Sequence, residues 1–142
     1  MERLIGIGKI AATVGGAAWT VKSLAIIAMN DHFQPIEGVL YFIGVGGILI
    51  GALGLAAFFG ARGSGAARWL IFVVVLGVAM VITAIASSFI QETVGDSYTG
   101  TNVGIEEEIG ILTPGVIWLA IGAFLLIATK PSNPDRSTTE VA

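Results

Sequence analysis

Four long apolar segments divide this chain and leave almost no room for other structure. They cover residues 7–29, 36–60, 69–90 and 106–129, and each is long enough for the roughly 20 residues that cross the hydrocarbon core of a bilayer. Charged residues make up 12% of the chain, about half of their share in a soluble domain. The sequence therefore predicts an all-α fold, an integral membrane four-helix bundle over residues 1–130 with antiparallel up-down topology.

Basic and acidic residues fall at opposite ends of such a bundle. The basic residues fall at one end: Arg3, Lys9, Arg62, Arg68, Lys130 and Arg136. The acids fall at the other: Asp31, Glu37, Glu92, Asp96 and Glu106 to Glu108. Because connections rich in Lys and Arg remain inside, we expect a multi-pass protein of the plasma (inner) membrane with its basic end inside. Both termini are then cytoplasmic, and residues 131–142 form a short polar cytoplasmic tail.

The first segment is read as a retained span rather than as a secretory signal. Arg3 and Lys9 precede it, as in a signal, but Lys22 interrupts the apolar run and no small-x-small cleavage pattern follows it.

Lys22 is the charge that this architecture must accommodate, because an isolated charge inside a membrane is costly. Its stem can extend toward the outer interface, where acids begin two of the helices. We expect Lys22 to point into the bundle and to pair with Glu37, Glu107 or Glu108. The alternative is that Lys22, Trp19 and one of these carboxylates serve a ligand.

Small residues recur at helical spacing in two segments. The second segment contains Gly44, Gly47, Gly51 and Gly54, at three- and four-residue steps. The first contains Gly8, Ala12 and Gly16, with Gly15 beside them. Small residues let helices approach closely in lipid, so we expect the first two helices to form a tight antiparallel pair. The alternative is that the glycine stripe faces outward and docks another protein.

Trp19 lies one helical turn from Lys22, on the same side of the first helix. An indole next to a cation allows a cation–π contact, and it could also cradle a quinone or a lipid headgroup. The favoured interpretation is simpler: Trp19 and Trp118 fill space between the helices.

Pro114 interrupts the hydrogen bonding of the fourth helix and frees a backbone carbonyl. This carbonyl falls near Glu107 and Glu108, where it could line a small polar cavity. That cavity is the one place in the sequence where transport is conceivable.

No other pattern supplies chemistry. The chain has no cysteine and one histidine, His32, which excludes disulfides, thiolate metal sites and a haem held by paired histidines within one chain. There is no nucleophile–base pair, phosphate-binding loop or basic patch for nucleic acid. The triplet Glu106–Glu108 could form a weak metal site with Asp31 and His32, but acids at a helix start explain it better. We expect no metal, no cofactor and no nucleic acid.

The run Gly15-Gly16-Ala17-Ala18-Trp19-Thr20-Val21-Lys22 resembles the first span of small four-span membrane proteins of actinobacteria. The resemblance covers this run and the four-span layout. It implies the fold and no particular activity.

The leading functional hypothesis is a non-catalytic accessory or structural subunit of a larger membrane complex. Its expected partners are the lipid bilayer and other integral membrane proteins or a second copy of the chain. The alternative is a small transporter or a lipid- or quinone-binding protein that uses Lys22 and an outer-leaflet carboxylate. An enzyme ranks third.

Overall fold

The structure, a computed structural model, describes residues 1–29, 35–95 and 103–130, without the side chains of residues 103–106. These residues contain no strand. They form the α-helices α1 (Glu2–Met29), α2 (Ile36–Gly60), α3 (Gly65–Ile90) and α5 (Val103–Ala128), and a π-helix, η1 (Gln91–Gly95), continues α3. Asp31, His32, Asp96 and the predicted tail lie outside the described residues.

The helices match the predicted segments and extend beyond them at their first residues. α1 begins at Glu2, α3 at Gly65 and α5 at Val103, where the apolar segments begin at residues 7, 69 and 106. Hydropathy marks only the part of a helix suited to hydrocarbon, whereas the backbone can stay helical through polar flanks. Gly65 has a φ of 53°, a left-handed conformation that glycine adopts without steric cost.

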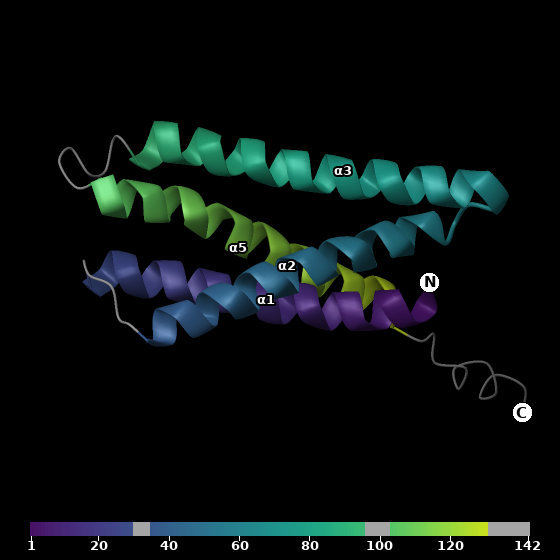
Figure 1. Cartoon of the computed structure of the whole chain (residues 1–142), viewed down its shortest axis with the longest axis horizontal. Helices are drawn as coiled ribbons and strands as arrows, with labels where there is room; N and C mark the ends of the chain where they lie inside the picture. The colour runs from purple at the N-terminus through teal and green to yellow at the C-terminus, as the bar shows by residue number, and fades with distance from the viewer. Residues whose placement is uncertain (30–34, 96–102, 131–142) are drawn as a thin grey trace, which may run out of the picture.

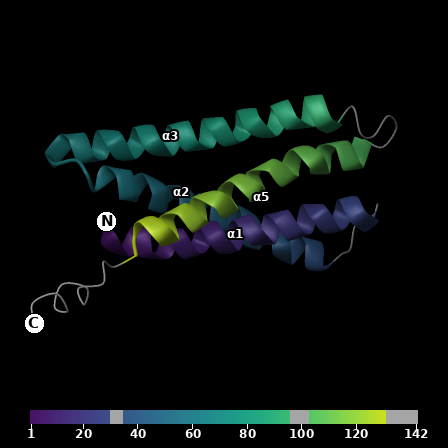
Figure 2. The ribbon, with the colours of Figure 1, turned by 180° about the vertical axis from the view of Figure 1, so that it is seen from behind.

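α1 lies across the bundle from α3, with α2 and α5 between them (Figure 1). It packs along its length against both α2 and α5, whereas α3 contacts α2 and α5 but not α1. Figures 1 and 2 show the same layout from opposite sides, with α3 along one edge of the bundle. All four α-helices are long and apolar enough to cross a membrane.

The contact between α1 and α2 is made by small residues. A Cβ added to Gly15 would lie 2.6 Å from Gly47 Cα, and one added to Gly51 would lie 2.7 Å from Ala12 Cβ. Gly8 meets Gly54 in the same way. The two backbones touch at these positions, so the glycine stripe of α2 is covered by α1.

One residue of the predicted stripe faces a different helix. Gly16 lies against α5, where an added Cβ would be 2.8 Å from Gly115 O. The prediction that Gly16 joins the contact with α2 is therefore wrong. Successive helical residues point about 100° apart, so Gly15 and Gly16 cannot both face α2. α1 thus has two small-residue faces, one for each neighbour.

The core lies between α1, α2 and α5. Its buried apolar side chains are Ala12, Ile48, Ala52, Leu55, Trp118 and Leu125. α3, which is described along its whole length, buries a single residue, Thr83.

The basic end of the bundle gathers both the start of α1 and the end of α5. Lys9 Nζ donates to Thr129 Oγ1 across 3.1 Å. Arg3 and Arg68 line a common depression of about 540 Å³ with Met1, Glu2 and Ala61. Basic residues that are far apart in the sequence are therefore neighbours in space.

Candidate functional site

Lys22 is buried between α1 and α5, and its ammonium group meets Glu108. Nζ lies 2.9 Å from Oε1 and 3.0 Å from Oε2, so it donates to both carboxylate oxygens. The residues are 3% and 6% exposed. This geometry neutralises two buried charges at once, and it ties α1 to the first turns of α5.

The other carboxylates expected to pair with Lys22 are not part of this ion pair. Glu107 is exposed, because consecutive helical residues point in different directions. Glu37 is half-buried in the first turn of α2. The side chain of Glu106 lies outside the described part of the chain. Of the three carboxylates proposed from the sequence, the ion pair contains Glu108.

Trp19 binds a backbone carbonyl instead of stacking on Lys22. Its Nε1 donates to Ile111 O across 2.6 Å. The indole packs over Gly44 and beside Tyr41, with ring centroids 5.6 Å apart. Cation–π contacts among the described residues are made by Arg62. Gly44 is thus small because an indole, rather than a backbone, lies against it.

Two hydroxyl groups near the ion pair are buried without a hydrogen-bond partner. They are Thr20 Oγ1 and Ser23 Oγ, which sit three residues apart on one side of α1. Burying a hydroxyl group without a hydrogen bond costs free energy, so both groups would gain from an additional polar contact.

The carbonyl freed by Pro114 has a partner. Pro114 cannot donate to Gly110 O, and Ser87 Oγ of α3 donates to that oxygen across 2.7 Å. The carbonyl that was predicted to line a polar cavity near Glu107 and Glu108 therefore takes part in a bond between α3 and α5. The helix continues through Pro114 without interruption.

Trp118 forms a second polar link to α3 that the sequence does not indicate. Its side chain is 0% exposed. Its Nε1 donates to Thr83 Oγ1 across 3.2 Å, and Thr83 Oγ1 donates in turn to Ala79 O across 2.8 Å. The sequence hints at such a link only through Thr83, a threonine inside an otherwise apolar segment, because a buried hydroxyl in a membrane span needs a partner. It does not specify that the partner is Trp118.

The described residues contain no group of three His, Cys, Asp or Glu side chains that could hold a metal ion. His32 and Asp31, which the weak metal hypothesis requires, are not among them.

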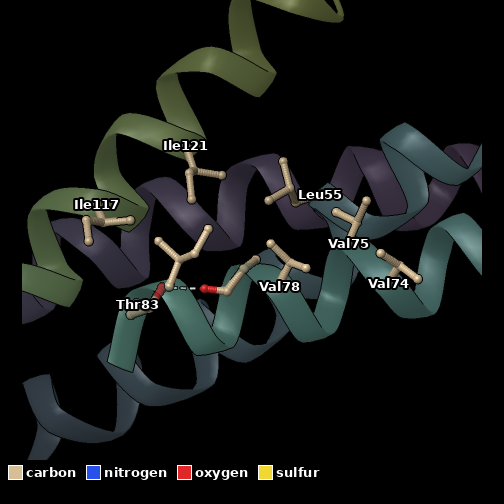
Figure 3. Close-up of a pocket in the computed structure, with 9 residues that line it drawn as sticks. Leu55, Val74, Val75, Val78, Thr83, Ile117 and Ile121 are labelled. Carbon is tan, nitrogen blue, oxygen red and sulfur yellow. Dashed lines mark hydrogen bonds between the residues drawn. The ribbon is translucent and has the colours of Figure 1, made fainter. Parts of the chain in front are cut away.

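A groove runs along α3 where it faces α2 and α5. We call it the α3 groove; it has a volume of about 360 Å³. Its lining residues are apolar except for Thr83: Leu55, Val74, Val75, Val78, Ala79, Ile82, Thr83, Ile117 and Ile121. In Figure 3, Ile117 and Ile121 of α5 lie across the groove from Thr83 and Val78 of α3.

At the basic end, aromatic rings hold Arg62 in place. Its guanidinium carbon lies 4.2 Å from the ring centroid of Phe58 and 5.0 Å from that of Phe59. Phe58 also packs edge-on against Phe124 of α5, with centroids 5.7 Å apart. Arg68 Nε donates to Gly63 O across 3.3 Å.

Comparison of the chain with protein-family models, with curated proteins and with solved structures finds no match.

Proposed function

We propose that this chain is an integral membrane protein whose four helices cross the bilayer as an antiparallel up-down bundle. The support is the length and composition of the helices. The contacts between α1 and α2 give further support, because the residue number of the α2 partner falls as that of the α1 residue rises. Gly8 meets Gly54, Gly15 meets Gly47 and Trp19 meets Gly44. Such an order is expected of neighbours that run in opposite directions.

The proposed orientation puts the basic end in the cytoplasm of a bacterial plasma membrane, with both termini inside. The chain lacks cysteine, so single cysteines introduced by Ser64→Cys and Glu92→Cys report the topology without background. An impermeant maleimide should label intact cells that carry Glu92→Cys and spare those that carry Ser64→Cys. The opposite pattern would reverse the orientation.

Within that membrane we propose a non-catalytic accessory subunit that packs against a larger membrane protein. The observation that carries this proposal is the uncovered state of α3, which buries Thr83 alone. One side of α3, here called the outer face, is formed by exposed residues at helical spacing: Val73, Gly77, Val81, Ala84 and Ser88. A Cβ added to Gly77 would meet nothing within 4 Å. Small residues on an open face allow another helix to approach closely.

The ion pair supports a structural role for Lys22 rather than a ligand-binding role. Both Glu108 oxygens already accept hydrogen bonds from Nζ, so an anionic ligand at Lys22 would have to displace a buried carboxylate. That displacement would leave a buried charge unpaired, which is strongly unfavourable. The alternative of a transporter or quinone-binding protein built on Lys22 is therefore less favoured.

Extraction in mild detergent tests the proposal. We expect the wild-type chain to co-purify with a defined integral membrane protein, and Val81→Trp on the outer face to release that partner. Val21→Trp is the matched control, since Val21 is 55% exposed on α1 and Val81 is 56% exposed on α3. A wild-type chain that migrates as a lone monomer would contradict the proposal. Equal loss of the partner in both variants would also contradict it.

A further inference from the structure

The α3 groove accepts only an apolar ligand along its length. Thr83 is its one polar lining residue, and the hydroxyl of Thr83 already donates to Ala79 O and accepts from Trp118 Nε1. The dashed line in Figure 3 marks the bond from Thr83. A polar ring or headgroup placed there would lose its own hydrogen bonds to water without replacement. A hydrocarbon chain would lose none.

The apolar surface continues from the groove toward the basic end. On α5, Phe124 lies three residues beyond Ile121, and on α2, Phe58 lies three residues beyond Leu55, so each ring extends the side that lines the groove. The two rings touch edge-on. Arg62 lies in the turn that follows the end of α2 at Gly60, with its guanidinium over Phe58.

The distances match one leaflet of a bilayer. Val74 and Thr83 are nine positions apart, which is about 14 Å along α3, close to half of the roughly 30 Å hydrocarbon core. Arg68 lies 15 positions before Thr83, or about 22 Å, and half of a bilayer with its headgroups measures roughly 20–22 Å. A chain that reaches Thr83 from the basic side therefore has its headgroup at the level of Arg68 and Arg62.

The charges favour an anionic headgroup at this end. A planar guanidinium binds phosphate through paired hydrogen bonds, and stacking on Phe58 and Phe59 fixes that of Arg62 in advance. At the other end, η1 carries the exposed acid Glu92, which repels phosphate. The ligand is thus oriented by charge as well as by depth.

We propose that the α3 groove binds one acyl chain of an anionic phospholipid from the leaflet at the basic end, with the lipid phosphate on Arg62. This inference rests on the proposed membrane insertion, but it does not need the proposed protein partner. The centre of the outer face lies away from the groove, since at about 100° per residue Val73 and Ala84 are roughly 140° and 120° around the helix from the groove residue Val78.

The test uses the full chain reconstituted with equal amounts of phosphatidylglycerol and phosphatidylcholine, then released in mild detergent. Native mass spectrometry counts the bound lipids. Wild type should retain one phosphatidylglycerol in preference to phosphatidylcholine. Val78→Trp, and separately Ile82→Trp, should lose it by filling the groove. Val73→Trp on the outer face is the matched control and should retain it, because Val78 and Val73 are 51% and 63% exposed.

Arg62→Gln should keep an acyl chain in the groove and lose the headgroup preference. One basic residue near an anionic headgroup contributes about 1 kcal/mol, which corresponds to a roughly fivefold fall in the ratio of phosphatidylglycerol to phosphatidylcholine. Circular dichroism of each variant establishes that the helices are retained.

Several results would overturn the proposal. One is that wild type retains the two lipids equally. A second is that Val78→Trp and Ile82→Trp keep their helices and still retain phosphatidylglycerol. A third is that a second copy of the chain or another protein occupies the groove. If Val78→Trp loses the lipid while Val81→Trp keeps its protein partner, the lipid site stands and the accessory-subunit proposal fails. A chain found in the soluble fraction would refute both proposals.

Discussion

Replacing Lys22 with methionine should destabilise the protein by an amount that follows from its pairing. The variant loses both hydrogen bonds to Glu108 and leaves a carboxylate that is only 6% exposed without its cation. Removing one partner of a buried ion pair costs about 3–5 kcal/mol. In a chain of this size each kcal/mol lowers the melting temperature by about 2–4 °C, so we expect a fall of roughly 6–20 °C.

The double variant distinguishes a structural pair from a functional one. Replacing a whole buried pair by apolar residues is neutral, or stabilising by about 1–4 kcal/mol, so Lys22→Met with Glu108→Met should melt at or above the wild-type temperature. Glu107→Gln is the control beside it, because Glu107 is exposed and its substitution should change stability by less than about 0.5 kcal/mol. Melting is followed by circular dichroism in one detergent.

Two results would refute this reasoning. One is a melting temperature for Lys22→Met within the range of the Glu107→Gln control. The other is a double variant that loses as much as the two single variants together, since residues that share one ion pair must show non-additive effects.

Two further substitutions test the helix contacts in the same melting assay. Gly47→Leu should destabilise the protein by more than the roughly 1–3 kcal/mol of ordinary overpacking, because the added atoms meet the α1 backbone. Gly46→Leu is the control and should be tolerated, because Gly46 faces open space. Equal destabilisation by the two substitutions would disprove the contact. Ser87→Ala should cost about 1–3 kcal/mol by leaving Gly110 O unpaired. That cost should shrink in a Pro114→Ala background, where residue 114 regains its N–H, and an unchanged cost would contradict the link.

Hydropathy and spacing predicted much of the helical arrangement because those signals are local. Four apolar segments of bilayer length predict four helices, and the glycine spacing of α2 predicts a close neighbour. Gly16 shows the limit of this reasoning. Its spacing from Ala12 fits one stripe, but the neighbour that meets it depends on where α5 lies, which no local pattern states.

The site was predictable to the level of residue type. A buried lysine requires a carboxylate, and the acids at helix starts limited the choice to three. Selecting Glu108 over Glu107 requires the rotation of α5 about its own axis. The bonds from Ser87 to Gly110 O and from Trp118 to Thr83 depend on the placement of α3, and a single threonine or serine in an apolar segment does not specify which helix it will meet.

The most direct test of this account is photo-crosslinking from the two sides of α3 in intact membranes. A benzophenone amino acid replaces Val73 on the outer face, Val78 in the groove, or the similarly exposed Val21 on α1. The account predicts one discrete protein adduct from position 73, a lipid adduct from position 78 and no discrete protein adduct from position 21. The absence of a protein adduct at position 73, or the same adducts from all three positions, would contradict it.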